Sequence, residues 1–284
     1  LLIEKGENLE ITGNRLGWNQ NYTVNGSKGS IKIQELNSKL NTFEKNMDFI
    51  YEAAKNAKQE DYVKIQNRYY SIIAEQSEYL KSFIDSNLES KSCILALFQA
   101  IKGENILHLN TNLDYYKKVS ESFEKNWPES SHTKLLSEII KTAYAPDFTM
   151  EDINGELFTF SELKGKLILI DVWASWCKPC RVANPKMVKL YNKFHNKGLE
   201  IISISLDGTP NQTSPKEDWE KAVSNDKLTW TQLSDLKGWD SKIRDSYNIK
   251  SIPYTILIDE NGLIIGEDLS HEVLNNKISE ILNL

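Results

Sequence analysis

The sequence predicts a two-domain protein in which a mostly α-helical region precedes an α/β domain. At 284 residues the chain is longer than one small domain. Over residues 31–143 apolar side chains recur at three- and four-residue steps, whereas from residue 144 strand-like runs alternate with helix-like ones. A Cys-x-x-Cys pair, Cys177 and Cys180, directly follows one of these strand-like runs. The predicted fold class is therefore α/β over 144–284, with a central mixed sheet flanked by helices.

The first segment, residues 1–30, is interpreted as short strands and turns that pack on the next region. Polar and apolar residues alternate weakly between Asn8 and Thr12, and Asn25-Gly26 is a turn signal. So small a segment cannot bury a core alone. No signal peptide is visible at the start, and because the first residue is not Met we expect a mature or trimmed form.

The helical domain, residues 31–143, has long outer faces rich in Lys and Glu. Asp61 and Ser131 are predicted N-caps. The tyrosines are interpreted as core aromatics with polar tips, with a binding groove as the alternative. Cys93, in an apolar run, is interpreted as a buried inert thiol, with a reactive cysteine as the alternative. The expected helices cover 31–57, 61–87, 90–101, 115–123 and 133–143.

The third segment, residues 144–284, opens with a hairpin around the turn signal Asn154-Gly155. Continuous apolar runs then predict buried strands. A second turn, Asn261-Gly262, returns the last strand antiparallel. The expected strands cover 167–173, 199–207, 228–233, 254–259 and 263–265, and the expected helices cover 181–197, 219–225, 239–247 and 270–284.

Composition excludes several classes of function. A net charge of −6 and a pI near 5.4 argue against binding to nucleic acid or to an anionic membrane surface. No apolar run reaches the length of about 18 residues that a transmembrane helix requires. The four histidines are scattered and there is no second cysteine pair, so we expect no zinc site and no other metal.

The cysteine pair lies in the stretch Trp173-Ala174-Ser175-Trp176-Cys177-Lys178-Pro179-Cys180. A Cys-x-x-Cys pair between a buried strand and a helix is typical of a redox site. The helix N-terminus offers free N–H groups and partial positive charge, and both favour a thiolate. We expect Cys177 at the exposed mouth and Cys180 one turn further on. Pro179 suits a first helical turn, where its missing N–H costs nothing.

Residues 145–284 resemble a thioredoxin-fold domain, in particular the TlpA-like thiol–disulfide interchange proteins of the bacterial envelope. The resemblance rests on the cysteine motif with Arg181, on Asp171, on Pro185 and on Ser251-Ile252-Pro253. It covers about half the chain. The upstream helical part resembles the corresponding region of multidomain members of this group, but no motif carries that likeness.

The resemblance implies roles for several residues. Pro253 is expected to be cis and to face the disulfide, which leaves the backbone of Ile252 free to pair with an extended substrate. Asp171 is expected beneath Cys180, where a buried carboxyl group could accept its proton; a strand-end cap is the alternative. The ammonium of Lys178 is expected to favour the thiolate, with a solvated lysine as the alternative. Trp176 and Pro179 complete the expected substrate-binding surface.

Two departures from the family pattern bear on Asp171. A glutamate common in relatives that serve cytochrome c maturation is replaced by Ala183, and the lysine that partners the buried acid in thioredoxins corresponds to Ser203. We therefore expect Asp171 to act without either partner.

The predicted function is thiol–disulfide oxidoreductase, with Cys177 attacking a substrate disulfide and Cys180 resolving the mixed disulfide. The alternatives are a thiol peroxidase of the peroxiredoxin type and a non-catalytic adaptor that acts through the helical domain. No cofactor is expected beyond the disulfide. Expected partners are protein dithiols or disulfides, an upstream electron donor or acceptor, and a protein bound by the helical domain. The resemblance implies the periplasm or cell envelope, with a removed N-terminal signal as a means of membrane anchoring.

Overall fold

The computed structural model describes residues 2, 6–13, 22–163 and 165–284. The chain divides into two compact units, Leu1–Lys141 and Thr142–Leu284, each with its own buried apolar core. The part of the predicted strand-and-turn segment that covers 14–21 lies outside the described residues. In the described part of the chain, no helix combines the length and the apolar character needed to cross a membrane.

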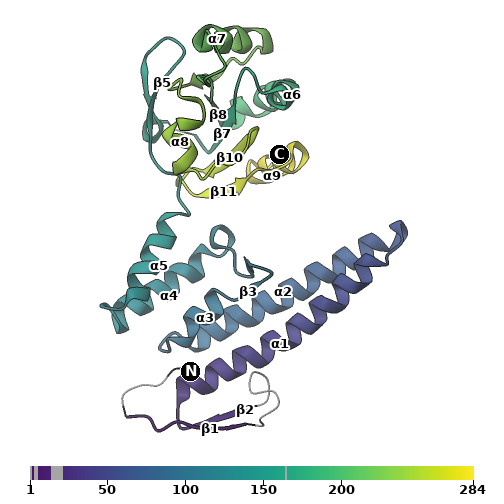
Figure 1. Ribbon diagram of the computed structural model, residues 1–284, viewed down its shortest axis with the longest axis vertical. Helices are drawn as coiled ribbons and strands as arrows, with labels where there is room; N and C mark the ends of the chain where they lie inside the picture. Colours follow the sequence, from purple (N-terminus) through teal and green to yellow (C-terminus); the bar gives the residue numbers. More distant parts are fainter. Residues whose placement is uncertain (1, 3–5, 14–21, 164) are drawn as a thin grey trace. The chain divides into compact units, whose positions relative to one another are not determined.

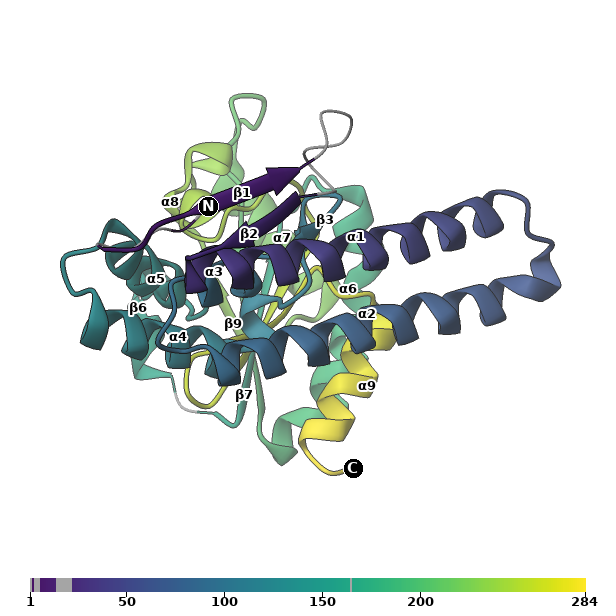
Figure 2. The ribbon, with the colours of Figure 1, turned by 90° about the horizontal axis from the view of Figure 1, so that it is seen from below.

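The first unit begins with an antiparallel pair of short strands and continues as helices (Figure 1). Ser27 caps the first helix, since its side chain accepts a hydrogen bond from the Ser30 N–H. The two long helices run side by side as a hairpin (Figure 2). The elements are β1 (Glu10–Gly13), β2 (Tyr22–Asn25), α1 (Lys28–Lys55), α2 (Tyr62–Ser86), α3 (Ser92–Leu97), β3 (Ala100–Ile101), β4 (Glu104–Asn105), α4 (Leu113–Asn126) and α5 (Ser131–Lys141).

Three local predictions in this unit need correction. The helix expected over 90–101 ends at Leu97, and the chain continues into the β3–β4 pair, whose turn is formed by Lys102 and Gly103 with positive φ values of 50° and 87°. Ser131 is the first residue of α5 rather than its cap. Asp61 does precede α2, but its side chain makes no capping hydrogen bond.

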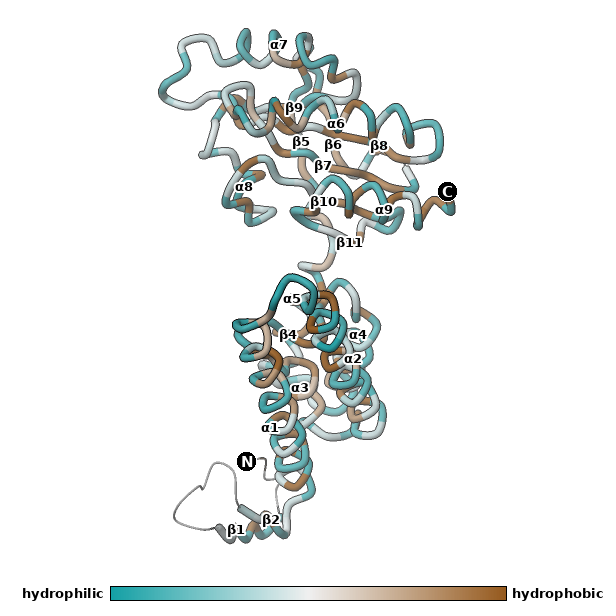
Figure 3. The backbone as a smooth tube through the Cα atoms, turned by 90° about the vertical axis from the view of Figure 1, so that its right-hand side faces the viewer, coloured by the Kyte–Doolittle hydropathy of each residue, from teal (hydrophilic) through white to brown (hydrophobic). Residues whose placement is uncertain are grey.

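The second unit is built on a five-stranded mixed sheet in the order β11-β10-β7-β8-β9. Strands β7, β8 and β9 are parallel, whereas β10 is antiparallel to β7 and to β11. Every residue of β7 is buried, which explains why all of them except Asp171 are apolar (Figure 3). The predicted fold class is confirmed. The strands are β5 (Thr149–Glu151), β6 (Leu157–Thr159), β7 (Leu167–Trp173), β8 (Leu199–Ser205), β9 (Thr231–Leu233), β10 (Tyr254–Asp259) and β11 (Ile264–Glu267).

Helices cover both faces of this sheet. Figure 1 shows α6 and α9 on one side and α8 on the other. The Lys193 ammonium of α6 donates a hydrogen bond of 2.9 Å to Asn275 of α9. The helix expected over 239–247 is a short 3-10 turn followed by α8, because Ser241 between them has an extended backbone. The helices are α6 (Lys178–Phe194), α7 (Pro215–Asp226), α8 (Lys242–Ser246) and α9 (His271–Ile281).

Candidate active site

Cys177 and Cys180 form a disulfide at the N-terminus of α6, with an S–S distance of 2.02 Å and a Cα–Cα distance of 5.3 Å. Cys177 is the N-cap of the helix, and its Sγ accepts a hydrogen bond of 3.2 Å from the Cys180 N–H. Pro179 lies in the first turn, as predicted. A sulfur in this position receives a backbone N–H and the positive end of the helix dipole, and both stabilise a thiolate.

The expectation that Cys177 is exposed is wrong for the disulfide form. Only 4% of Cys177 is exposed, because its sulfur is bonded to Cys180 and turned back onto the first turn of the helix. The exposed surface here belongs to its neighbours Trp176, Lys178 and Pro179. Trp176 is 38% exposed and donates its indole N–H to the carbonyl of Leu206 at 3.3 Å. These neighbours are therefore the first groups that an approaching protein would meet.

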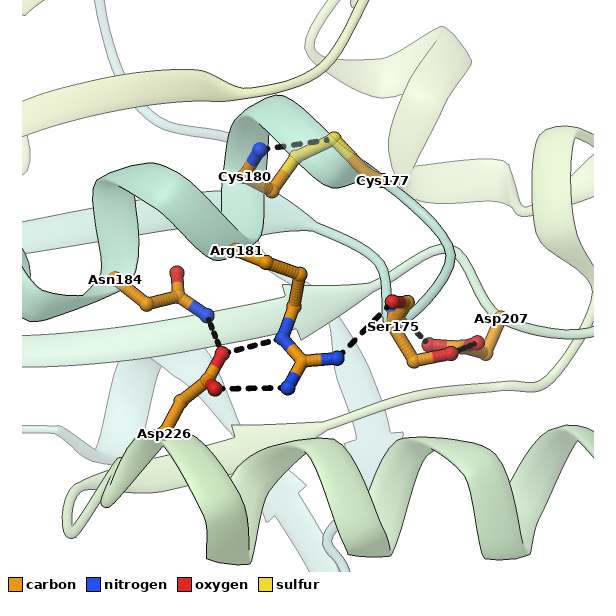
Figure 4. A network of polar contacts seen from close by, with 7 residues as sticks. All are labelled: Ser175, Cys177, Cys180, Arg181, Asn184, Asp207 and Asp226. Carbon is orange, nitrogen blue, oxygen red and sulfur yellow. Dashed lines mark hydrogen bonds and ion pairs between the residues drawn. A yellow bond between two sulfur atoms is a disulfide. The ribbon is translucent and has the colours of Figure 1, made fainter.

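Asp207 anchors the loop that leads into the motif. This residue follows β8 and is completely buried. Its carboxylate accepts hydrogen bonds from the backbone N–H of Ser175 at 2.9 Å and from the Ser175 hydroxyl (Figure 4). Ser205 and Gln212 donate to the same carboxylate. Four donors on one buried carboxylate hold the backbone two residues before Cys177 in a single position.

Arg181 anchors the helix side of the same motif. Its guanidinium group donates two hydrogen bonds to the carboxylate of Asp226, the last residue of α7, and one of 3.3 Å to the carbonyl of Ser175 (Figure 4). Asn184 donates to the same carboxylate at 2.7 Å. Burial would raise the pKa of Asp226, but these hydrogen bonds and the charge of Arg181 hold it below its ordinary value.

Asp171 lies on β7 and is only 4% exposed. Burial raises its pKa to about 6, although a hydrogen bond of 3.0 Å from the Ser203 hydroxyl opposes the rise. Ser203 also contacts Trp230, which packs on Tyr191 of α6 with ring centroids 5.1 Å apart. Asp171 is therefore on the face of the sheet that α6 covers, and Ser203 supplies the hydrogen-bond partner that the sequence comparison did not anticipate.

The peptide bond between Ile252 and Pro253 is cis, as the resemblance implies. Strand β10 begins directly afterwards, and its first residue, Tyr254, lies opposite Val172 near the end of β7. Pro253 is consequently at the edge of the sheet from which the motif loop leaves. Pro253 is exposed and Ile252 is half-buried.

Three residues of the site, Asp207, Asp226 and Trp230, were not selected from the sequence. The position of Asp207 could have been predicted, because it ends an apolar run. The carboxyl ends of neighbouring parallel strands meet at one edge of the sheet, which places Asp207 near the motif that follows β7. No sequence signal identifies Asp226 or Trp230, because each contacts its partner only in the folded chain. Among the described residues, no group of three or more His, Cys, Asp or Glu side chains is placed to hold a metal ion.

A thioredoxin-like sheet with a Cys-x-x-Cys disulfide at the start of α6 defines the class of thiol–disulfide exchange proteins. Residues 142–266 match the AhpC/TSA family. The chain is 33% identical over 133 residues to the thiol–disulfide oxidoreductase ResA of Bacillus cereus, a match that covers 45% of this chain and 69% of the relative. The chain belongs to the TlpA/ResA-like family of thiol–disulfide oxidoreductases.

The chain is also similar to two other proteins. The chain is 38% identical over 120 residues to the thioredoxin-like protein YneN of Bacillus subtilis, covering 42% of this chain and 66% of the relative. These matches span about two thirds of the length of the two curated relatives. A solved thiol–disulfide oxidoreductase from Bacteroides fragilis shares 32% identity over 49% of this chain and 98% of its own, with a TM-score of 0.45.

Proposed function

We propose that this protein exchanges thiols and disulfides with protein substrates, with Cys177 as the attacking thiolate and Cys180 as the resolving thiol. The observation that carries the proposal is the disulfide between these two residues at the N-terminus of α6. In the reduced form, the Cys177 thiolate attacks a substrate disulfide, forms a mixed disulfide and releases one substrate thiolate. Cys180 then attacks Cys177 Sγ, which closes the internal disulfide and releases the second substrate thiolate. Two electrons pass to the substrate, and the reverse sequence oxidises a dithiol.

The Cys180 thiol must lose a proton before it attacks, and we assign this proton to Asp171. Two observations support the assignment: Asp171 lies on the sheet face covered by α6, and its pKa of about 6 lets it accept a proton near neutral pH. Trp176, Lys178, Pro179, Ile252 and Pro253 would shape the surface on which the substrate segment lies. The exchange needs only the Cys177–Cys180 disulfide as its redox group.

Family membership supports a place in the cell envelope, where an upstream electron donor or acceptor would reset the cysteine pair after each turnover. The helical unit is proposed to bind a protein partner. Its exposed apolar side chains include Phe49, Val63 and Tyr70, with exposed fractions of 74%, 64% and 59%.

Cysteine variants test the proposal directly. Cys177→Ser should abolish reduction of an insulin disulfide, whereas Cys180→Ser should accumulate mixed disulfides that separate on a non-reducing gel. Cys93→Ser, which removes a completely buried thiol of the other unit, is the matched control and should keep full activity. Insulin reduction that survives in Cys177→Ser would refute the proposal. Rapid consumption of hydrogen peroxide by the unaltered protein would favour a thiol peroxidase instead.

A further inference from the structure

Ser203 stands between two partners whose hydrogen bonds have fixed directions. This completely buried residue of β8 is in register with Asp171 on β7. Its Oγ lies 2.8 Å from the indole nitrogen of Trp230 and 3.0 Å from Oδ2 of Asp171. An indole N–H can only donate, and a serine hydroxyl has a single proton to donate. Trp230 therefore donates to Ser203, and the Ser203 proton is directed at Asp171.

The other groups around Asp171 come from each element that packs on it. Strand β10 contributes Thr255, its register partner, and β9 contributes Gln232 beside Ser203. Helix α6 covers this face of the sheet; it carries Cys180 at its N-terminus, and its Tyr191 contacts Trp230. The titratable groups among those named are Tyr191 and, in the reduced form, the Cys180 thiol, and none of the named groups carries a fixed charge. The hydroxyl of Ser203 is thus the neutral donor that opposes the effect of burial on Asp171.

We propose that Ser203 and Trp230 are a pair of positioning residues that together determine how readily Asp171 takes up a proton. Trp230 acts only through Ser203. While its N–H occupies a lone pair of Oγ, the hydroxyl cannot rotate away from the carboxylate, and a donor that also accepts is a stronger donor. The consequence for catalysis rests on the proposed role of Asp171 as proton acceptor.

The test is a titration of Asp171 in the full oxidised chain, observed by the NMR signal of its ¹³C-labelled carboxyl carbon. Ser203→Ala should raise the pKa of Asp171 by about one pH unit, because a hydrogen bond to the carboxylate is lost. Trp230→Phe keeps the aromatic shape and should raise it by a smaller amount, about 0.5. The double variant should match Ser203→Ala alone, since Trp230 has no other route to Asp171. Ser203→Thr keeps the hydroxyl and should restore the original value.

Trp219→Phe is the matched control, because the indole nitrogen of Trp219 is also buried but has no hydrogen-bond partner among the described residues. It should leave the titration unchanged. An unchanged pKa in Trp230→Phe, or additive shifts in the double variant, would overturn the proposal. The pH profile for release of the mixed disulfide distinguishes the positioning role of Ser203 and Trp230 from the role of Asp171 as proton acceptor. If the pKa moves as expected while that profile does not, the positioning pair stands and Asp171 is not the proton acceptor.

Discussion

The guanidinium group of Arg181 and the carboxylate of Asp226 join the helix that carries the disulfide to the end of α7. Arg181 follows Cys180 directly, and Asp226 is the residue at which α7 ends. The guanidinium also reaches the carbonyl of Ser175 at 3.3 Å, so one side chain links the loop before Cys177 to the helix after Cys180. Two carboxylates from distant segments therefore hold the motif in place. Asp207 binds the loop before Cys177, and Asp226 binds Arg181 of helix α6.

Asp226→Asn should lower the free energy of unfolding by about 1–3 kcal/mol at pH 7, because the side chains of Arg181 and Asn184 lose a charged acceptor in a partly buried place. The pKa of Asp226 is lowered in the folded state, so its contribution is present above the unfolded value of about 4 and is lost as the pH falls towards the folded value. Urea unfolding at several pH values measures this. The difference between the two proteins should be constant from about pH 5 to 8 and shrink below about pH 4.

Glu220→Gln, on the same helix, is the matched control for this prediction. Glu220 pairs with Lys216 at 4.0 Å, and both side chains are well exposed, at 43% and 55%. Exposed pairs contribute little, so we expect a change below about 0.5 kcal/mol. An equal loss of unfolding free energy in the two variants would mean that the Arg181–Asp226 contact stabilises the fold no more than an exposed ion pair.

Asp171→Asn should have the opposite effect on stability. The folded pKa is raised from 3.8 to about 6, so the folded state holds its proton more tightly than the unfolded chain. The stability of the unaltered protein therefore falls as the pH rises from about 4 to about 6, and remains lower above that range. The variant lacks this loss and should be more stable at pH 8 by on the order of 2–3 kcal/mol.

Unfolding curves at pH 4, 6 and 8 check this prediction, with the advantage of Asp171→Asn vanishing towards pH 4. Asp152→Asn serves as the comparison. Asp152 is half-buried in the β5–β6 turn, and although burial would raise its pKa, hydrogen bonds from the backbone N–H groups of Glu156 and Asn154 lower it. Its pH dependence should have the reverse sign. If Asp171→Asn is less stable than the unaltered protein at every pH, the ionised carboxylate of Asp171 does not destabilise the folded state and the prediction is wrong.

Asp207→Asn should loosen the motif loop. An amide has one oxygen where the carboxylate has two, so at least one of its four donors, which include the Ser175 N–H, loses its acceptor. We expect amide hydrogen exchange at residues 175–177 to become at least about tenfold faster, which corresponds to about 1.4 kcal/mol. Asp259→Asn is the control, since Asp259 also accepts backbone N–H groups, in the distant β10–β11 turn. Unaltered exchange at 175–177 in Asp207→Asn would show that Asp207 does not hold the loop.

Much of the sheet was predictable because buried parallel strands have an unmistakable local signature. The runs that became β7 and β8 are mostly apolar, and both the alternation of strands with helices and the turn Asn261-Gly262 predicted a mixed sheet. The errors occurred where one residue redirects the backbone. Gly103 lies in the turn between β3 and β4, beyond a segment whose apolar pattern predicted a longer helix. Ser241 interrupts a second segment whose apolar residues have helical spacing.

The site was predictable where a short motif carries it and not where distant residues complete it. The pairing of Cys177 with Cys180 follows from a contiguous motif, and the cis bond before Pro253 is what the family resemblance implies. The supporting contacts span long stretches of chain: Ser175 and Asp207 are 32 residues apart, Arg181 and Asp226 are 45 apart, and Ser203 and Trp230 are 27 apart. No spacing rule connects such pairs, since only the packing of α6 and α7 on the sheet brings them together.

Cys93 should be inert in the folded protein. It is completely buried in the helical unit, and burial raises the pKa of its thiol to about 12. Thiol reagents attack the thiolate, whose population at pH 8 is then roughly one part in 10,000. After reduction of the disulfide, mass spectrometry should find no iodoacetamide adduct on Cys93 of the native chain and one on Cys93 of the chain in denaturant. The Cys177→Ser/Cys180→Ser double variant isolates the remaining thiol and should show none and one, respectively. A native adduct on that variant within minutes would instead establish Cys93 as a reactive cysteine.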